Sequence, residues 1–440
     1  MKLALVAVAV AVAACVPSRS ELRSPVDSEV ARRLGAPVAL GDDAGVSALL
    51  ARPLDTDAAI RIALAHSPRM RAALDDLGIA GGEIAAATVL GPVVVDAQFV
   101  HGGGETEYDY SAVQDVMGLI AGSRRRAAAR AELDAARATA AATALRLAAR
   151  VEIAFHDLYA AQQEVELRRT AFEAADTAAT LRERMHDAGN TSDLAVARDR
   201  DAREQTRIDL ARAEAEVEQR REAVNALLGL TGDQTKWTAA GALADPPGAA
   251  PALDDLEASA VAASLELAAG RARVDAATNT LGDERVRAIL PALGLGVGAI
   301  DRDHNLEFGP AIRIGIPLFD QRRGQRARAA AELSRAGHEL EADAIELRAA
   351  ARAARIAALS AYLEARHIHE VVLPLRQQIV DETLRHYNAM DVDPFQLIVA
   401  RRDLADAGHQ YLDALRRYAN AMSEVAALRR GVRLDSPTDR

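Results

Sequence analysis

Apolar residues recur at alternating intervals of four and three positions through much of the chain, which is the spacing of one face of a long helix. From Gly122 to Ala188 the sequence holds no proline, and no glycine after Gly122 itself. A helix over that segment would be roughly 100 Å long at about 1.5 Å per residue. Its core positions contain one charged residue, Arg168, and are otherwise apolar: Leu147, Val151, Ala154, Leu158, Ala161, Val165, Phe172, Ala175 and Ala179.

This pattern stops at residues 189–192 and resumes over 193–228, so we expect an antiparallel helical hairpin over 122–229. The resumed stretch keeps the seven-residue repeat at Leu210, Val217 and Val224.

The second half of the chain repeats this plan. A helix is expected near 252–288, then a long helix over 321–389 and a final helix after a break at 391–394, giving a second hairpin over 321–431. Pro374 lies inside the long helix and is expected to kink it.

Between these helices lie four short segments typical of strands. The first is β-branched, near 92–100, and a weaker one runs over 112–120. The other two, near 291–300 and 310–318, alternate apolar residues with glycine or polar residues.

The two halves align at an offset near 200, since Ala131, Glu132 and Leu133 match Ala331, Glu332 and Leu333. We therefore expect two repeats, over 55–240 and 251–431, and a polar tail over 432–440. Residues 16–54 are rich in Pro, Gly and Asp and are expected to form an extended leader.

The first fourteen residues are apolar after Lys2 and are too short to span a membrane, which favours a signal peptide over 1–14. The junction at Ala13, Ala14 and Cys15 resembles the lipobox of bacterial lipoproteins. This resemblance implies that the chain is cleaved before Cys15 and that the Cys15 thiol is acylated. It also implies sorting to the outer membrane, because Val16 stands where Asp is the usual retention signal. The alternative is an ordinary signal peptide with an incidental cysteine.

Alternation in the last two strands suits the wall of a membrane barrel. Leu293, Leu295, Val297 and the isoleucines at 312, 314 and 316 would face lipid, and four residues would face the lumen: Gly294, Gly296, Gly298 and Arg313. On this basis Leu295→Arg should impair assembly and Gly296→Ala should cost far less. Four strands cannot close a barrel, so several chains would contribute. Two soluble hairpins capping a coiled coil are the alternative.

Composition excludes several classes of protein. A formal charge of −11 argues against a nucleic-acid partner, and a single cysteine excludes an intrachain disulfide or a cysteine-clustered zinc site. No nucleophile–base set or phosphate loop has a supporting context, so we expect neither an enzyme nor a cofactor. His367 and His369 are two apart on a helix, which is poor geometry for a metal. Arginines at 124–126 and 322–323 meet either lipid headgroups or solvent.

Several segments, in their order, resemble the TolC-type outer-membrane efflux proteins, in particular the lipid-anchored members. The resemblance covers residues 55–431 and lies in four motifs: 63–73 with an echo at 262–269, 225–229, 310–320, and Tyr387 to Met390, where the family has Tyr-x-x-Gly.

The resemblance implies a mainly α fold in which long helical hairpins form an α-barrel. Four strands per chain would contribute to a twelve-stranded transmembrane β-barrel of a homotrimer. The function it implies is that of a passive outer-membrane duct for substrates delivered by an inner-membrane pump and a periplasmic adaptor protein. A periplasmic structural or adaptor lipoprotein without a channel is the alternative, although an adaptor should have a single hairpin.

The resemblance also places the channel entrance at the hairpin tips. Candidate residues there are Gly189 and Asp193 in the first tip, and Met390, Asp391, Asp393 and Gln396 in the second. Where the family has aspartates just inside the second tip, this chain has Gln396 and Val399, so the charge of the gate stays open. Asp393 precedes Pro394 and also suits a helix N-cap.

Overall fold

The computed structural model describes residues 17–89, 93–102, 105–302, 305–317, 321–392 and 394–434. The chain divides into two compact units, and each takes segments from both sequence repeats. The first unit consists of Met1–Arg32, Ala72–Ala142 and Leu265–Glu346, and the second of Arg33–Arg71, Thr143–Ser264 and Leu347–Arg440. Cys15 and the expected signal peptide lie outside the described residues.

The first unit contains a helix where the sequence analysis expects an extended leader, so that expectation is wrong for α2 (Arg19–Leu34). Ser18 and Glu21 form a reciprocal cap, because the Ser18 N–H donates to Glu21 Oε2 at 2.7 Å and the Glu21 N–H to Ser18 Oγ at 3.3 Å. Leu22, Val26 and Val30 are buried at intervals of one turn. Leu22 packs against Gly81 of α5 (Pro68–Thr88), where a Cβ would come within 2.7 Å of it.

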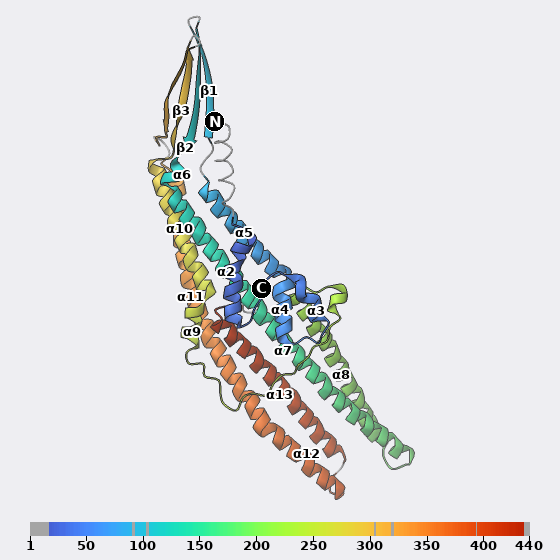
Figure 1. Ribbon diagram of the computed structural model, residues 1–440. Helices are drawn as coiled ribbons and strands as arrows, with labels where there is room; N and C mark the ends of the chain where they lie inside the picture. The colour runs from blue at the N-terminus through green and yellow to red at the C-terminus, as the bar shows by residue number, and fades with distance from the viewer. Residues whose placement is uncertain are drawn as a thin grey trace. The chain divides into compact units, whose positions relative to one another are not determined.

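The same unit holds one antiparallel sheet in the order β1 (Val93–Gly102), β2 (Glu105–Asp115), β3 (Leu293–Arg302) and β4 (Asn305–Ile314). Figure 1 shows its strands extending from the ends of α6 (Met117–Ile120) and α10 (Leu265–Ile289).

The expected second strand over 112–120 is therefore wrong in its bounds. Ten residue pairs hold 105–114 against β1, and the Asp115 carboxylate then accepts from the Met117 N–H at 2.8 Å at the start of α6. The fourth strand likewise lies earlier than 310–318.

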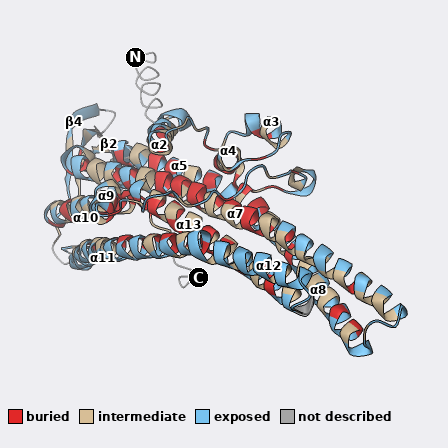
Figure 2. Cartoon of the chain, turned by 90° about the horizontal axis from the view of Figure 1, so that it is seen from below, coloured by how far each residue is buried: buried red, intermediate tan, exposed pale blue. Residues whose placement is uncertain are grey.

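The second unit holds most of both hairpins. The first hairpin pairs α7 (Gly122–Asp187), which begins in the first unit, with α8 (Asp193–Leu228). The second pairs α12 (Leu373–Asn388) with α13 (Pro394–Arg429). The expected core positions of α7, which we call the α7 seam, are largely buried, as Figure 2 shows. Exposed residues prevail along α12. Trp237, which is 3% exposed, stacks on Phe155 and donates to Asn225 Oδ1 at 2.8 Å.

Pro374 perturbs the long helix, as expected. The helix is α11 (Arg323–His367), then a π-helical turn at Ile368–Val372, then α12, with the proline in the first turn of α12. A π turn interrupts the regular hydrogen-bond pattern of an α-helix. Pro374, which lacks an N–H, is therefore accommodated where this pattern already changes.

The duplication is visible in the backbone. α4 (Thr56–His66) ends at Ser67 and α9 (Leu256–Ala263) ends at Ser264, before α5 and α10 respectively. Both serines are buried and extended, with ψ of 128° and 121°. The break within the expected helix over 252–288 is thus a repeated feature rather than an irregularity.

Close packing in the sheet corrects the expectation for Gly296. A Cβ there would lie 1.9 Å from the Ala112 carbonyl oxygen and 2.7 Å from the Val113 Cα, both backbone atoms of β2. At Gly298, two residues along the same face, the nearest atom would be 3.7 Å away. Glycine at 296 is therefore required by the approach of β2, and its substitution is not cheap.

We predict that Gly296→Ala weakens the pairing of β2 with β3 by about 1–3 kcal/mol, the usual cost of overpacking. Amide hydrogen exchange over 105–115, read by mass spectrometry, should accelerate in this variant. Gly298→Ala adds the same methyl group where there is room and serves as the matched control. Equal protection in the two variants would contradict the steric argument.

Candidate functional site

The strand register gives the sheet two chemically different faces. Gly294 pairs with Arg313, Gly296 with Ala311 and Gly298 with Gly309, so the four residues expected to line the lumen share one face. The same face carries mostly polar side chains from β1 and β2: Asp96, Gln98, Glu107, Asp109, Ser111 and Asp115. This confirms their common face, while their role in a pore remains a prediction.

The opposite face is apolar and exposed. Leu295 pairs with Ile312 and Val297 with Pro310, and these positions continue across the sheet to Val95 and Phe99. Phe308, Phe99 and Val95 are each more than 70% exposed. Near the hairpin ends of the strands, Tyr108 packs edge-on against Phe99 at 5.9 Å. An exposed apolar face of this kind is unfavourable in water and is typical of a sheet face in contact with lipid. Aromatic residues near one end of the strands are typical of the lipid–water interface.

One ion pair shows how the polar face is shaped. Arg313 of β4 pairs with Asp96 of β1, although two strands lie between them. In a flat sheet three strand spacings would separate these backbones by roughly 14 Å, beyond the reach of the two side chains. The sheet is therefore curled with the polar face inside, and the glycines of β3 leave the arginine room to cross it.

The first hairpin tip turns at Gly189, whose φ is +75°. Its N–H donates to the His186 carbonyl at 2.7 Å, and the Ser192 side chain caps α8 by accepting from Ala195 N–H. Asp193 opens α8, and its Oδ1 lies 2.7 Å from His186 Nε2.

The second tip turns at Met390, which adopts φ +61° and is 94% exposed. This is the left-handed conformation for which the family motif has glycine, so the turn is kept while the residue is not. Asp391 lies 3.3 Å from His386 Nδ1. The two tips thus each contain a histidine–aspartate pair, and the histidines stand 200 positions apart, a feature that the sequence analysis missed.

Gln396 lines a shallow hollow of about 320 Å³ beside the second tip, together with His386 and Val392. Asp393, the expected cap, lies outside the described residues, and α13 begins at the next residue. The structure therefore brings Asp391 and Gln396 to one end of the second hairpin.

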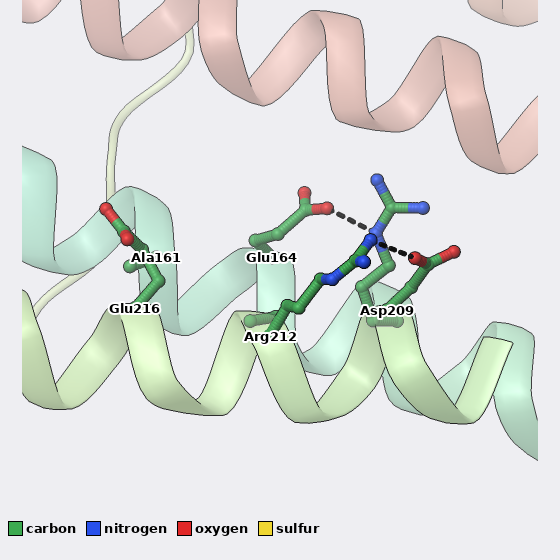
Figure 3. A pocket seen from close by; sticks show the side chains of 7 residues that line it. Ala161, Glu164, Asp209, Arg212 and Glu216 are labelled. Atoms are coloured by element: carbon green, nitrogen blue, oxygen red, sulfur yellow. Dashed lines mark hydrogen bonds and ion pairs between the residues drawn. The ribbon is translucent and has the colours of Figure 1, made fainter. Parts of the chain in front are cut away.

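A second hollow, of about 350 Å³, lies between α7 and α8 where Ala161 and Ala213 face it (Figure 3). Small side chains at both positions leave the gap, and charged residues surround it. Arg168, the charged residue of the α7 seam, is held by Glu164 at 2.6 Å. An arginine at a core position is thus satisfied locally, and the hollow lacks a converging set of groups for catalysis.

A polar cluster, centred on Asp157 of α7, joins three helices of the second unit. Its carboxylate accepts from Arg220 of α8 at 3.3 Å and from Arg416 and Asn420 of α13 at 3.2 and 2.9 Å. The Asp157 side chain is 16% exposed, so these bonds form largely out of water.

His156 lies beside this cluster, with Ser423 Oγ 3.5 Å from its Nδ1. Burial lowers its pKa, against the opposing effects of Glu152, Asn420 and Asp157. Burial raises the pKa of Glu424 on α13.

His367 and His369 lie in different helical elements. His367 ends α11, while His369 lies in the π turn and stacks on Tyr411 at 5.2 Å. Within the described ranges no group of three or more His, Cys, Asp or Glu side chains could hold a metal ion. Nor does any helix among those residues have the length and apolarity needed to cross a membrane.

We predict that the helical region loses stability as pH falls from 7.5 to 5.5, in part through His156. Its folded pKa lies below the unfolded value, so the unfolded chain takes up the proton first and gains stability, at most about 1.4 kcal/mol per pH unit. His156→Gln should flatten the dependence of the unfolding midpoint on pH.

Glu424→Gln provides the matched control of opposite sign. The raised pKa of Glu424 favours the folded state as pH falls, so its removal should steepen the same curve. Identical slopes in wild type and His156→Gln would show that the histidine is not buried in the neutral form.

No protein-family model and no curated protein sequence matches the chain. Solved structures do. The CmeC outer membrane channel of Campylobacter jejuni aligns with TM-score 0.72 and 13% identity, over 87% of each chain. A membrane protein from Pseudomonas aeruginosa gives 0.71 and 18%, over 89% of this chain and 97% of the other. The outer membrane protein VceC of Vibrio cholerae gives 0.68 and 15%, over 86% and 97%. The chain therefore has the fold of TolC-type outer-membrane channels.

Proposed function

We propose that this chain is the subunit of a passive outer-membrane channel that exports substrates. The observation that carries the proposal is the curled sheet, with an exposed apolar face outside and a polar, glycine-containing face inside. Such a sheet suits a wall between lipid and water. Solved structures with the same fold support this proposal, since they include outer membrane channels.

The channel is proposed to be a homotrimer. A four-stranded sheet leaves the edges of β1 and β4 open, and eight strands enclose an interior that side chains fill. Three copies give twelve strands and room for a lumen. Association is also favoured by a stripe of exposed apolar residues on α11, the π turn and α12: Ile356, Leu363, Val371, Leu375 and Ile379.

Transport through such a duct is driven elsewhere. We propose that an inner-membrane pump supplies the energy and that a periplasmic adaptor protein meets the hairpin tips. The tips suit an entrance because their turns at Gly189 and Met390 are exposed and lie at the ends of long helices.

Anchoring at Cys15 completes the proposed localisation in the outer membrane. We predict that Cys15→Ala abolishes incorporation of labelled palmitate in cells, because the thiol is the acyl acceptor. The barrel should still assemble, since an acyl chain adds membrane affinity without closing strands. Label persisting in the variant would refute acylation at Cys15.

The channel itself is tested by conductance in planar bilayers. Purified full-length protein should give discrete single-channel currents, and their absence in properly inserted trimers would refute the proposed function. We predict that Asp391→Asn lowers cation selectivity, moving the reversal potential in a salt gradient toward zero. Three copies of this carboxylate would surround one opening and attract cations.

Asp233→Asn is the matched control for that measurement. Asp233 is 95% exposed and lies beyond the end of α8 opposite to the tip, so the same change of charge should leave selectivity unaltered. An unchanged reversal potential in Asp391→Asn would mean that Asp391 does not contribute to a charge ring at the entrance.

A further inference from the structure

Apolar side chains are exposed around the end of the sheet where the strands join the helices. They belong to the end of α5, to α6, to the end of α10 and to the segment after β4, and we call them the apolar collar: Val89, Leu119, Ile120, Ile289 and Ile316. Their exposed fractions range from 49% to 80%. All lie in the first unit, and Ile316 keeps the two-residue alternation of Ile312 and Ile314 on the apolar face of the sheet.

The short helix α6 holds part of the collar in place. Met117 is 2% exposed and fixes the helix, while Leu119 and Ile120 remain 65% and 49% exposed. Two large apolar side chains exposed on one short helix are unfavourable on a surface that faces water.

Two arginines lie four residues from a collar isoleucine. Arg124 lies four residues after Ile120, and Arg285 lies four residues before Ile289 on a helix of opposite direction. In both cases the arginine backbone is one turn, or about 6 Å, farther from the sheet than that of the isoleucine. The Arg124 guanidinium lies against Gly282 of α10. Arg124, Arg285 and Arg323 are exposed, and we call these three the arginine belt.

Charge in this region is opposite to that of the whole chain. Residues 116–130 carry four arginines and no acidic residue, and residues 315–330 carry four arginines and one aspartate, in a chain of formal charge −11. The nearby acids are already engaged, since Asp283 pairs with Arg287 at 2.8 Å and Glu284 with Arg322 at 3.1 Å. The belt is therefore electropositive where it emerges.

We propose that the apolar collar and the arginine belt form a binding surface for anionic phospholipid at the periplasmic face of the outer membrane. The collar would enter the acyl region and the belt would meet the phosphates about one helical turn away. This proposal rests on the proposed function, because it requires the sheet to lie in the membrane. Charge complementarity and continuity with the apolar sheet face identify the leaflet as the occupant.

The test uses full-length protein reconstituted into nanodiscs that contain equal amounts of phosphatidylethanolamine and phosphatidylglycerol. The lipids that the protein retains are counted by native mass spectrometry. Wild type should retain phosphatidylglycerol preferentially, by about fivefold for each arginine that engages a headgroup. The triple variant Arg124→Gln, Arg285→Gln, Arg323→Gln should lose the preference. The same three positions changed to Lys should keep it.

The matched control changes three exposed arginines outside the belt: Arg207→Gln, Arg212→Gln and Arg335→Gln. It alters net charge equally and should retain the wild-type preference. Ile120→Ser with Ile289→Ser should lower the total lipid retained without changing the headgroup ratio.

Three results would overturn the inference. One is an equal headgroup ratio in the belt variant and the control. Another is a protein that inserts and conducts but shows no headgroup preference, which leaves the proposed function intact. A belt variant that loses binding to purified peptidoglycan while keeping its lipid preference would assign the surface to the cell wall. Failure of wild type to insert or conduct would instead refute the proposed function.

Discussion

The open edges of the four-stranded sheet are the constraint on which the rest of this structure depends. β1 and β4 lie at its two edges, and the apolar face between them is exposed. Unpaired backbone groups cannot remain in a hydrocarbon layer, so a sheet of this kind is stable there only when further copies pair with its edges. Assembly is thus a requirement for the sheet to enter the membrane. The exposed apolar stripe on α11, the π turn and α12 favours the same association from the helical part.

Curvature is the second requirement for closure, and the glycines of β3 contribute to it locally. Gly296 has no side chain, so the backbone of β2 can approach it and nothing projects from this position on the polar face. The Arg313 side chain can therefore extend across the polar face to Asp96. A side chain at Gly296 would push β2 away, whereas Gly298 is not under this demand. Alternation alone does not distinguish these two glycines, since the difference arises from the neighbouring strand.

The hairpins are predictable because apolar periodicity extends over many turns. A seven-residue repeat from Leu147 to Ala179 indicates a long helix that packs through one apolar face. Short elements were less secure. The expected strand over 112–120 leaves out the alternating polar and aromatic residues over Glu105 to Tyr110, so β2 begins earlier than expected. Helix α2 is not expected from the sequence because residues 16–54 are rich in Pro, Gly and Asp, although Ser18 and Glu21 have the spacing of a capping box. The histidine–aspartate pairs at the tips required the turn geometry, which brings His186 to Asp193 across the break.

The helical part distributes its constraints unevenly, and this bears on how a duct could open. Around Asp157, one carboxylate joins α7, α8 and α13, with Trp237 and Phe155 packed nearby in the same unit. At the second tip the interactions are local: Met390 has a left-handed backbone, and Asp391 of the turn lies beside His386 in the last turn of α12. Few buried contacts and a local turn are the features of a segment that moves at low cost, whereas a buried network linking three helices resists displacement. Motion at the proposed entrance is therefore compatible with a fixed body, because His386, Met390 and Asp391 share none of the described partners of the Asp157 cluster.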